Sequence, residues 1–285
     1  MEPEILYKKM DDLGEGPTYD ERRNRVYWID IRGKKFHYLD LGNGGMETFA
    51  SIGMISSIVP TNGDMMAATV DHGFYLIDEK GKHTLITGVE RNQKSTRFND
   101  GKADPYGNYV AGSMDLEEKR PIGSLYVLSG KTTKVLLKNL TISNGIAWDT
   151  KKMIFYHIDT PQRRVDAYSY DKNMDIKKIG VAADFKGETG NPDGMTIDAD
   201  GNIWVAHWGG NRISVFNPEN QKKIDEIKFP AQNITSCVFA GDGLRDLYVS
   251  SASNGNTDDL GGSLFKVKTD YEGSKTFVFK ISGLS

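Results

Sequence analysis

Short apolar segments alternate with clusters of Gly, Asn, Asp and Pro along the whole chain. No window of about 11 to 18 residues shows the i, i+3, i+4, i+7 apolar spacing of an amphipathic helix. The apolar segments are rich in β-branched and aromatic residues, as in residues 203–206, which read Ile-Trp-Val-Ala. Such runs, bounded by turn-forming residues, are typical of strands. The pattern therefore predicts an all-β chain.

One hairpin recurs along the chain. In residues 191–206, Asp193 precedes a short strand, an Asp-Gly-Asn turn follows at residues 200–202, and a second strand comes after the turn. Counterparts of this hairpin begin near five other positions, namely Glu15, Ile55, Asn99, Asn144 and Ser236. The chain therefore contains six similar units.

The unit starts are separated by roughly 45 residues, and a further apolar segment follows each hairpin. A period of this length, with about four strands per unit, indicates a β-propeller. Separate sandwich domains would need linkers, and no Ser-, Gly- or Pro-rich linker interrupts the series. We therefore predict that residues 1–285 form a single domain, a six-bladed β-propeller. Residues 271–281 or residues 5–7 would supply the strand that closes the ring.

The composition excludes several classes of partner. The 285 residues carry 36 basic and 39 acidic side chains, a net charge of −3, without a run of Lys or Arg, so a nucleic-acid partner is not expected. The N-terminus lacks the features of a secretory signal, and no apolar stretch of about 18 residues is present. We expect a cytoplasmic protein without a membrane partner, and its oligomeric state stays open. The single cysteine, Cys237, excludes an intramolecular disulfide and reads as a small buried hydrophobe.

Polar side chains occupy one repeated position, directly before the first strand of four units. They are Glu15, Asn99, Asn144 and Asp193. The innermost strands of a propeller begin at the same end of the central channel, so these four side chains are expected to meet there. Two carboxylates and two carboxamides form a set of hard oxygen ligands that suits Ca²⁺, Mg²⁺ or Mn²⁺. The alternative is that they only cap strand starts, as Asn and Asp do in many turns. Their shared register favours a common site.

Other signatures of chemistry are missing. The five histidines show no H-E-x-x-H spacing, and the chain has no G-x-S-x-G nucleophile elbow. It also has neither a G-x-x-x-x-G-K-[ST] phosphate loop nor a G-x-G-x-x-G fingerprint. The repeated polar position therefore carries the main functional signal.

Four motifs, in the order of the chain, resemble the gluconolactonase family, which includes regucalcin (senescence marker protein) and luciferin-regenerating enzyme. They are Leu-Gly-Glu-Gly-Pro at 13–17, Arg-Phe-Asn-Asp-Gly-Lys at 97–102, Ser-Asn-Gly-Ile-Ala-Trp at 143–148 and Pro-Asp-Gly-Met at 192–195. The resemblance spans nearly the whole chain. It implies a six-bladed propeller with one divalent cation in the channel and an activity on sugar lactones.

The resemblance also implies a cation site. The implied metal ligands are Glu15, Asn144 and Asp193. The cation would be Ca²⁺, Mg²⁺, Mn²⁺ or Zn²⁺, and the sequence leaves its identity open. Asp193 would act as the catalytic base, although coordination lowers the basicity of a carboxylate. A role for Asp193 as a group that only orients a metal-bound hydroxide is the alternative.

Three further residues match substrate-contacting positions of the family. They are Arg97, Asn99 and Glu117. Arg97 would hold sugar hydroxyls or a developing oxyanion through its fork of donors. The match of Glu117 is looser, because the segment from Asp115 to Ser124 is shorter than in regucalcin-like members.

We therefore expect a cation-dependent hydrolase that converts small sugar lactones to aldonic acids. One rival is a cation-dependent esterase or lactonase for another substrate class, such as aryl esters, aromatic lactones or organophosphates. A second rival is a non-enzymatic calcium-binding regulatory protein. A third is a protein-binding scaffold, which need not keep a polar ring in its channel.

Overall fold

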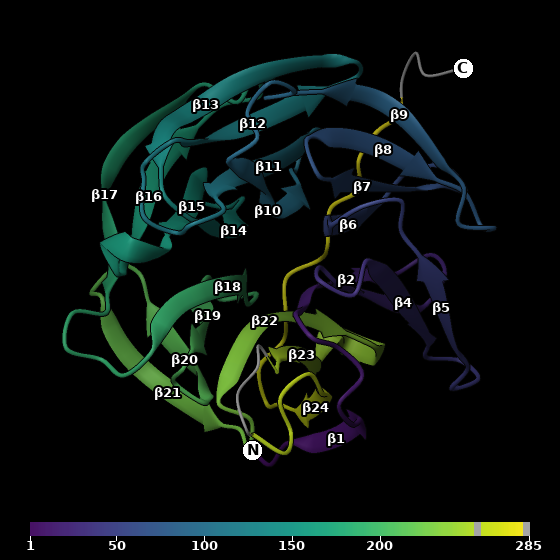
Figure 1. Ribbon diagram of the computed structural model, residues 1–285. Helices are drawn as coiled ribbons and strands as arrows, with labels where there is room; N and C mark the ends of the chain where they lie inside the picture. Colours follow the sequence, from purple (N-terminus) through teal and green to yellow (C-terminus); the bar gives the residue numbers. More distant parts are fainter. Residues whose placement is uncertain (254–257, 282–285) are drawn as a thin grey trace.

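The protein is a ring of six sheets around a central channel (Figure 1). The computed structural model describes residues 1–253 and 258–281. Each sheet has four antiparallel strands. Within the described residues, the helical elements are the 3₁₀-helices η1 (Thr160–Gln162) and η2 (Asp242–Leu244). The predicted all-β, six-bladed propeller is confirmed.

The strands of blades 1 to 5 run in sequence order from the channel outward. Blade 1 contains β2 (Gly14–Asp20), β3 (Arg25–Asp30), β4 (Lys35–Asp40) and β5 (Met46–Ala50). Blade 2 contains β6 (Ile55–Pro60), β7 (Met66–Val70), β8 (Gly73–Ile77) and β9 (His83–Gly88). Blade 3 contains β10 (Thr96–Ala103), β11 (Tyr109–Asp115), β12 (Gly123–Ser129) and β13 (Thr132–Leu140). Blade 4 contains β14 (Ser143–Asp149), β15 (Ile154–Asp159), β16 (Arg164–Tyr170) and β17 (Ile176–Asp184). Blade 5 contains β18 (Asn191–Ile197), β19 (Ile203–Trp208), β20 (Arg212–Asn217) and β21 (Lys222–Lys228).

Blade 6 joins the two ends of the chain. It contains β22 (Asn233–Ala240), β23 (Asp246–Ala252), β24 (Leu264–Lys268) and, on its outside, β1 (Glu4–Tyr7). β1 pairs antiparallel with β24, with Glu4 opposite Lys266. Of the two segments predicted to close the ring, the N-terminal one therefore does so.

The C-terminal segment has a different task. Residues 271–281, here called the C-terminal strap, cross the end of the channel as the yellow trace in Figure 1. The strap forms a bridge from Gly273 to Asp198 in blade 5 and another from Phe279 to Thr61 in blade 2. It contacts the turns at which the inner strands end. The strap therefore closes the channel end opposite to the strand starts.

Aspartates in the inner hairpins explain why the local sequence turns where it does. In the hairpin of blade 5, the Asp198 carboxylate accepts hydrogen bonds from the backbone N–H groups of Asp200 (3.0 Å) and Asn202 (2.8 Å). Asp104 does the same in blade 3 with Tyr106 and Asn108. An Asp side chain that binds its own following backbone stabilises such a turn. The repeated turns are therefore set by local chemistry.

The core lies between the blades, so the inner strands are buried on both faces. Every residue of β14 and β22 is buried, whereas β13 and β21 at the rim alternate or are mostly exposed. Aromatic side chains fill the seams: the ring centroids of Trp204 and Phe239 are 5.1 Å apart between blades 5 and 6. No helix in residues 1–253 and 258–281 has the length and apolar character needed to cross a membrane.

The strap is expected to stabilise the ring through Phe279, which is 0% exposed and lies 6.1 Å from the Tyr109 ring. Phe279→Ala removes this buried ring and should lower the free energy of unfolding by about 3 to 5 kcal/mol. Urea unfolding followed by tryptophan fluorescence measures the loss. Leu85→Ala, at a side chain that is 47% exposed, is the control and should change the value by less than about 0.5 kcal/mol. Equal effects of the two substitutions would contradict a packed strap.

Candidate functional site

The four repeated polar residues meet at the mouth of the channel, where the inner strands begin. Glu15, Asn99, Asn144 and Asp193 all line one cavity of about 170 Å³, together with Arg97. The alternative in which each residue only caps its own strand does not predict a shared cavity. The geometry instead brings residues from blades 1, 3, 4 and 5 to one place.

A register irregularity in each inner strand aims these side chains at the channel. The shifts lie between Glu15 and Thr18 in β2, and between Pro192 and Met195 in β18. β10 and β14 are irregular at the same place, from Phe98 to Gly101 and from Ser143 to Ile146. A bulge turns a side chain away from the regular alternation of a strand and is common beside functional sites.

The glycines after Asn144 and Asp193 allow the inner strands to approach one another. A Cβ atom on Gly194 would lie 2.2 Å from the Ser236 Oγ atom, and one on Gly145 would lie 2.7 Å from the Asp193 carbonyl oxygen. Neither position has room for a larger residue. The Asn-Gly and Asp-Gly pairs of the sequence therefore combine a polar ligand with the close packing that brings the ligands together.

Aspartates at the ends of the second strands hold the segments that lead into the inner strands. Asp30 accepts hydrogen bonds from the backbone N–H groups of Asp12 (3.1 Å) and Leu13 (3.0 Å), just before Glu15. Asp159 accepts them from Thr141 (3.1 Å) and Ile142 (2.9 Å), just before Asn144. Glu15 and Asn144 are therefore each placed by their own blade.

Asn99 links Arg97 to the next blade. The Nη1 atom of Arg97 donates to the Asn99 Oδ1 atom (2.9 Å) and to the Phe98 carbonyl oxygen (2.8 Å). The Asn99 Nδ2 atom donates in turn to the Asn144 Oδ1 atom (3.2 Å) and to the Ser143 carbonyl oxygen (2.9 Å). These bonds assign the two ends of the Asn99 amide and fix its orientation.

The network continues from blade 4 into blade 5. The Asn144 Nδ2 atom donates to the Thr160 Oγ1 atom (2.9 Å), which donates to the Pro192 carbonyl oxygen (2.9 Å) beside Asp193. The Asn144 Oδ1 atom therefore faces Asn99 in the polar ring, while a hydrogen bond from the Asn144 amide acts to lower the pKa of Asp193. An oxygen in this position is a suitable ligand for a hard cation.

The two acids are held in an unfavourable environment. Burial raises the pKa of Glu15 to about 8, and the nearby charge of Asp100 adds to the effect. Burial also raises the pKa of Asp193, which is 5% exposed, and repulsion by the Glu15 carboxylate contributes next. Two carboxylates that repel each other in the interior are stabilised by a positive charge between them.

The donor set fits a hard divalent cation. The described residues hold no group of three or more His, Cys, Asp and Glu side chains that could bind a metal. A cation at the channel mouth would therefore depend on the carboxylates of Glu15 and Asp193 and on the amide oxygen of Asn144. Carboxylate and amide oxygens, with positions left for water, suit Ca²⁺ or Mg²⁺ better than softer metals.

Arg97 lies inside the cavity wall and is 9% exposed. Burial lowers its pKa to about 10, and the charges of Glu118 and Glu15 oppose this shift. The guanidinium therefore stays protonated at neutral pH. A buried, fixed cation of this kind can bind an oxygen atom of a ligand.

The acid at the cavity is Glu118, whereas Glu117 is exposed and does not line it. The turn after β11 explains the difference. The Glu118 backbone N–H donates to the Asp115 carbonyl oxygen (3.0 Å), and Glu118 takes a left-handed conformation with φ of 60°. The Asp115 carboxylate also binds the Arg120 Nη2 atom (2.8 Å). A role for Glu117 in binding substrate stays a prediction that this geometry does not favour.

Sequence reasoning also missed Arg32 and Trp208, which line the cavity. Trp208 ends β19 opposite Asn191, so the hairpin register places it at the same end of the channel as Asp193. The position of a residue at the end of the second strand was the available signal. Arg32 lies between β3 and β4, and no pattern in the sequence distinguishes it from other turn residues.

Comparison with known sequences gives a consistent set of matches. Residues 13–253 match the family described as SMP-30/Gluconolactonase/LRE-like region. Regucalcin of Gallus gallus is 35% identical over 272 residues, which cover 90% of each chain. YvrE of Bacillus subtilis (strain 168), named as a candidate sugar lactone lactonase, is 34% identical over 249 residues and covers 86% of this chain and 85% of its own.

Comparison with known structures agrees. A luciferin-regenerating enzyme aligns with a TM-score of 0.91 and 30% identity, covering 98% of this chain and 99% of its own. Regucalcin of Agrobacterium tumefaciens, described as a calcium-binding protein, aligns with a TM-score of 0.91 and 26% identity, covering 96% of each chain.

The raised pKa of Glu15 predicts how the cation-free protein responds to pH. Between the ordinary value of 4.5 and the folded value of about 8, the folded protein binds more protons than the unfolded chain. Its stability should therefore fall as the pH rises through this range, by at least about 1.4 kcal/mol, the equivalent of one pKa unit. Urea unfolding of chelated protein at mildly acidic and mildly alkaline pH measures this loss.

Two further measurements give this prediction its controls. Added Ca²⁺ should stabilise the protein more at alkaline pH, where both acids are ionised. Glu15→Gln should flatten the pH dependence, and Glu21→Gln, at an exposed turn, should leave it unchanged. Stability that rises with pH over the same range would contradict the electrostatic account of the site.

Proposed function

Because this chain belongs to the SMP-30/gluconolactonase/LRE-like family, we propose that it hydrolyses small sugar lactones to aldonic acids with a divalent cation at the channel mouth. The observation that carries the proposal is the convergence of Glu15, Asn144 and Asp193 beside Arg97 and Asn99 in one cavity. The name of the Bacillus subtilis relative supports the choice of a lactone as the substrate.

The cation site would consist of Glu15, Asn144 and Asp193. A divalent cation bound there supplies a Lewis acid that polarises the lactone carbonyl and makes nearby water more acidic. The hydrogen bond from Asn144 to Thr160 orients the amide oxygen for this task. Repulsion between the two carboxylates gives the site its affinity, because the cation relieves it.

Asp193 is the proposed base. Its carboxylate would take a proton from the attacking water while the water oxygen bonds to the carbonyl carbon. The bond from that carbon to the ring oxygen then breaks, and the proton passes from Asp193 to the leaving oxygen. Burial raises the pKa of Asp193 in the cation-free site, and a bound cation would act in the opposite direction. If Asp193 only orients the water, its pKa has no role in the proton transfer.

Arg97 and Asn99 would position the substrate. Both hydrogen bonds that Arg97 makes within the described part of the chain use Nη1, so Nε and Nη2 are directed to other partners or to the cavity. The guanidinium has five donors in total, enough to hold Asn99 and bind a sugar hydroxyl or the developing oxyanion. The exposed Glu118 at the rim adds an acceptor for hydroxyl groups.

One observation favours a second candidate substrate class. Part of the cavity wall is apolar, made by Leu13, Ile31, Met114, Ile142 and Trp208. Such a wall can contact the C–H face of a sugar ring, but it can also accept an alkyl or aryl group. The protein would then hydrolyse a less polar lactone or ester with the same cation and the same base.

Substitution of the proposed base tests the mechanism. Asp193→Ala should lower kcat/KM for glucono-1,5-lactone by roughly 10²-fold or more, because both a cation ligand and the base are lost. Proton release in a pH-stat measures the rate, and Glu15→Gln should have a similar effect. Asp200→Ala, at an exposed turn of the same hairpin, is the matched control and should retain the wild-type rate. Full activity in excess chelator would refute the cation mechanism.

A substrate panel separates the candidate classes. We expect kcat/KM for hydroxylated sugar lactones to exceed that for an aryl lactone such as dihydrocoumarin by about tenfold or more, because unpaired polar groups in the site penalise an apolar substrate. The reverse order would favour the second candidate. Cation binding by calorimetry without turnover of any substrate would favour a calcium-binding, non-enzymatic protein.

A further inference from the structure

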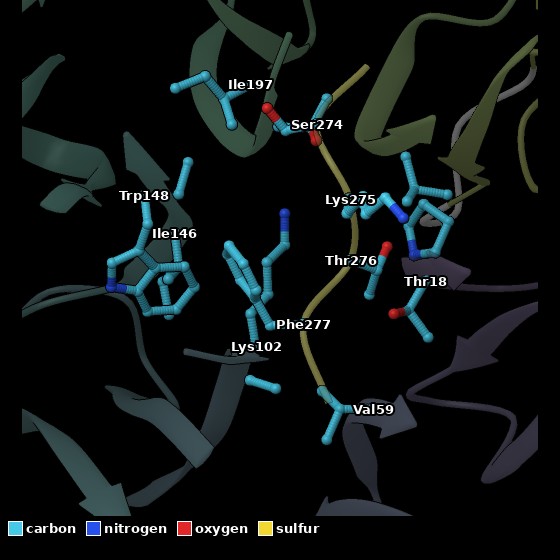
Figure 2. Close-up of a pocket in the computed structure, with 15 residues that line it drawn as sticks. Thr18, Val59, Lys102, Ile146, Trp148, Ile197, Ser274, Lys275, Thr276 and Phe277 are labelled. Carbon is cyan, nitrogen blue, oxygen red and sulfur yellow. The ribbon is translucent and has the colours of Figure 1, made fainter. Parts of the chain in front are cut away.

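A lysine lies in the channel between the proposed cation site at the mouth and the strap at the other end. Lys102 belongs to β10, three positions after Asn99, and lines a second, smaller cavity of about 50 Å³. Figure 2 shows its side chain reaching into the middle of the channel, between Ile146 on one side and Thr276 of the strap on the other. The channel axis therefore carries a fixed positive charge.

The ammonium group of Lys102 ties two blades together. Its Nζ atom donates a hydrogen bond to the Met195 carbonyl oxygen. Met195 lies on β18, two positions after Asp193, whereas Lys102 lies on the strand of Asn99. The bond therefore joins the strand of the proposed base to the strand of a proposed substrate-binding residue, across the channel.

The same charge acts on the acids of the channel. Asp100 is 6% exposed, and its Oδ2 atom has no hydrogen-bond partner among the described residues. Burial raises the pKa of Asp100, and the charge of Lys102 acts in the opposite direction. Lys102 also opposes the rise in the pKa of Glu15. Its field therefore reaches the proposed cation ligands.

Solvent screens this field only in part, because the side chain of Lys102 is partly buried. The strap covers the far end of the channel, with Thr276 and Phe277 lining the smaller cavity beside Lys102. This partial burial of Lys102 lowers the pKa of its ammonium group. Charges in such an interior interact more strongly than charges at a surface. A positive charge here repels a cation at the channel mouth.

We propose that Lys102 is a positioning residue with two effects: its charge limits how tightly the channel holds a divalent cation, and its bond to Met195 keeps Asp193 in place for catalysis. The inference rests on the proposed cation site at Glu15, Asn144 and Asp193. A lysine that only stabilised the fold would have a different signature, because its loss would weaken cation binding and catalysis together.

Lys102→Met tests the two effects separately, since methionine keeps the stem and removes the ammonium group. Calorimetric titration of chelated protein with CaCl₂, at mildly alkaline pH so that the interior acids stay ionised, should show a Kd lower by about tenfold. At saturating Ca²⁺, kcat for lactone hydrolysis should fall by about tenfold or more. Tighter binding with slower turnover is the expected combination.

The matched control is Lys151→Met. The Lys151 Nζ atom also donates to a backbone carbonyl, that of Ala199 (2.7 Å), but it lies on the exposed surface. This substitution should leave both the Kd and kcat at wild-type values. The double variant Lys102→Met with Asp100→Asn keeps the net charge of the channel. Its Kd should return to within about threefold of wild type, because the net charge is restored. The kcat should stay low, because the hydrogen bond from Lys102 to the Met195 carbonyl oxygen is still missing.

Asp100→Asn alone provides a second test should Lys102→Met fail to fold. It removes a negative charge and should raise the Kd for Ca²⁺ by about tenfold. An unchanged or higher Kd in folded Lys102→Met, or an unchanged Kd in Asp100→Asn, would overturn the inference while the proposed function stands. Absence of Ca²⁺ binding in the wild-type protein would overturn the cation site itself, and the inference with it.

Discussion

The repulsion between two interior carboxylates is the constraint on which the site depends. Glu15 and Asp193 belong to blades 1 and 5, and burial raises the pKa of both. They meet only because the ring closes, which requires β1 to pair with β24 from the other end of the chain. The large buried seams between blades compensate for this local destabilisation. The stability of the fold therefore allows two carboxylates that repel each other to lie close together, where they can bind a cation.

The channel is different at its two ends, and this difference organises the chemistry. The mouth holds the amide network of Asn99 and Asn144 and the cavity of about 170 Å³. The strap crosses the far end and lines the smaller cavity beside Lys102. Burial strengthens the electrostatic interactions between charged groups. The partial burial of Lys102 therefore makes its charge relevant to the site.

Much of this arrangement could be predicted from local sequence. The six units are visible because the hairpins carry their own turn chemistry, as in the hydrogen bonds that the Asp198 carboxylate accepts from the backbone N–H groups of residues 200 and 202. The convergence of Glu15, Asn99, Asn144 and Asp193 could be predicted because equivalent positions of a closed repeat share one end of the channel. The residues that surround these four side chains could not be predicted, because they are set by contacts between blades.

The sequence by itself determined the number of blades, their strand order and the four polar residues at the mouth, because periodicity and turn residues act over short distances. Only the tertiary structure decided which chain end closes the ring and that Glu118 rather than Glu117 reaches the cavity. Each of these depends on a single backbone angle or on a pairing between distant segments. The contact of Lys102 also could not be predicted from the sequence, because its hydrogen-bond partner Met195 lies on another blade.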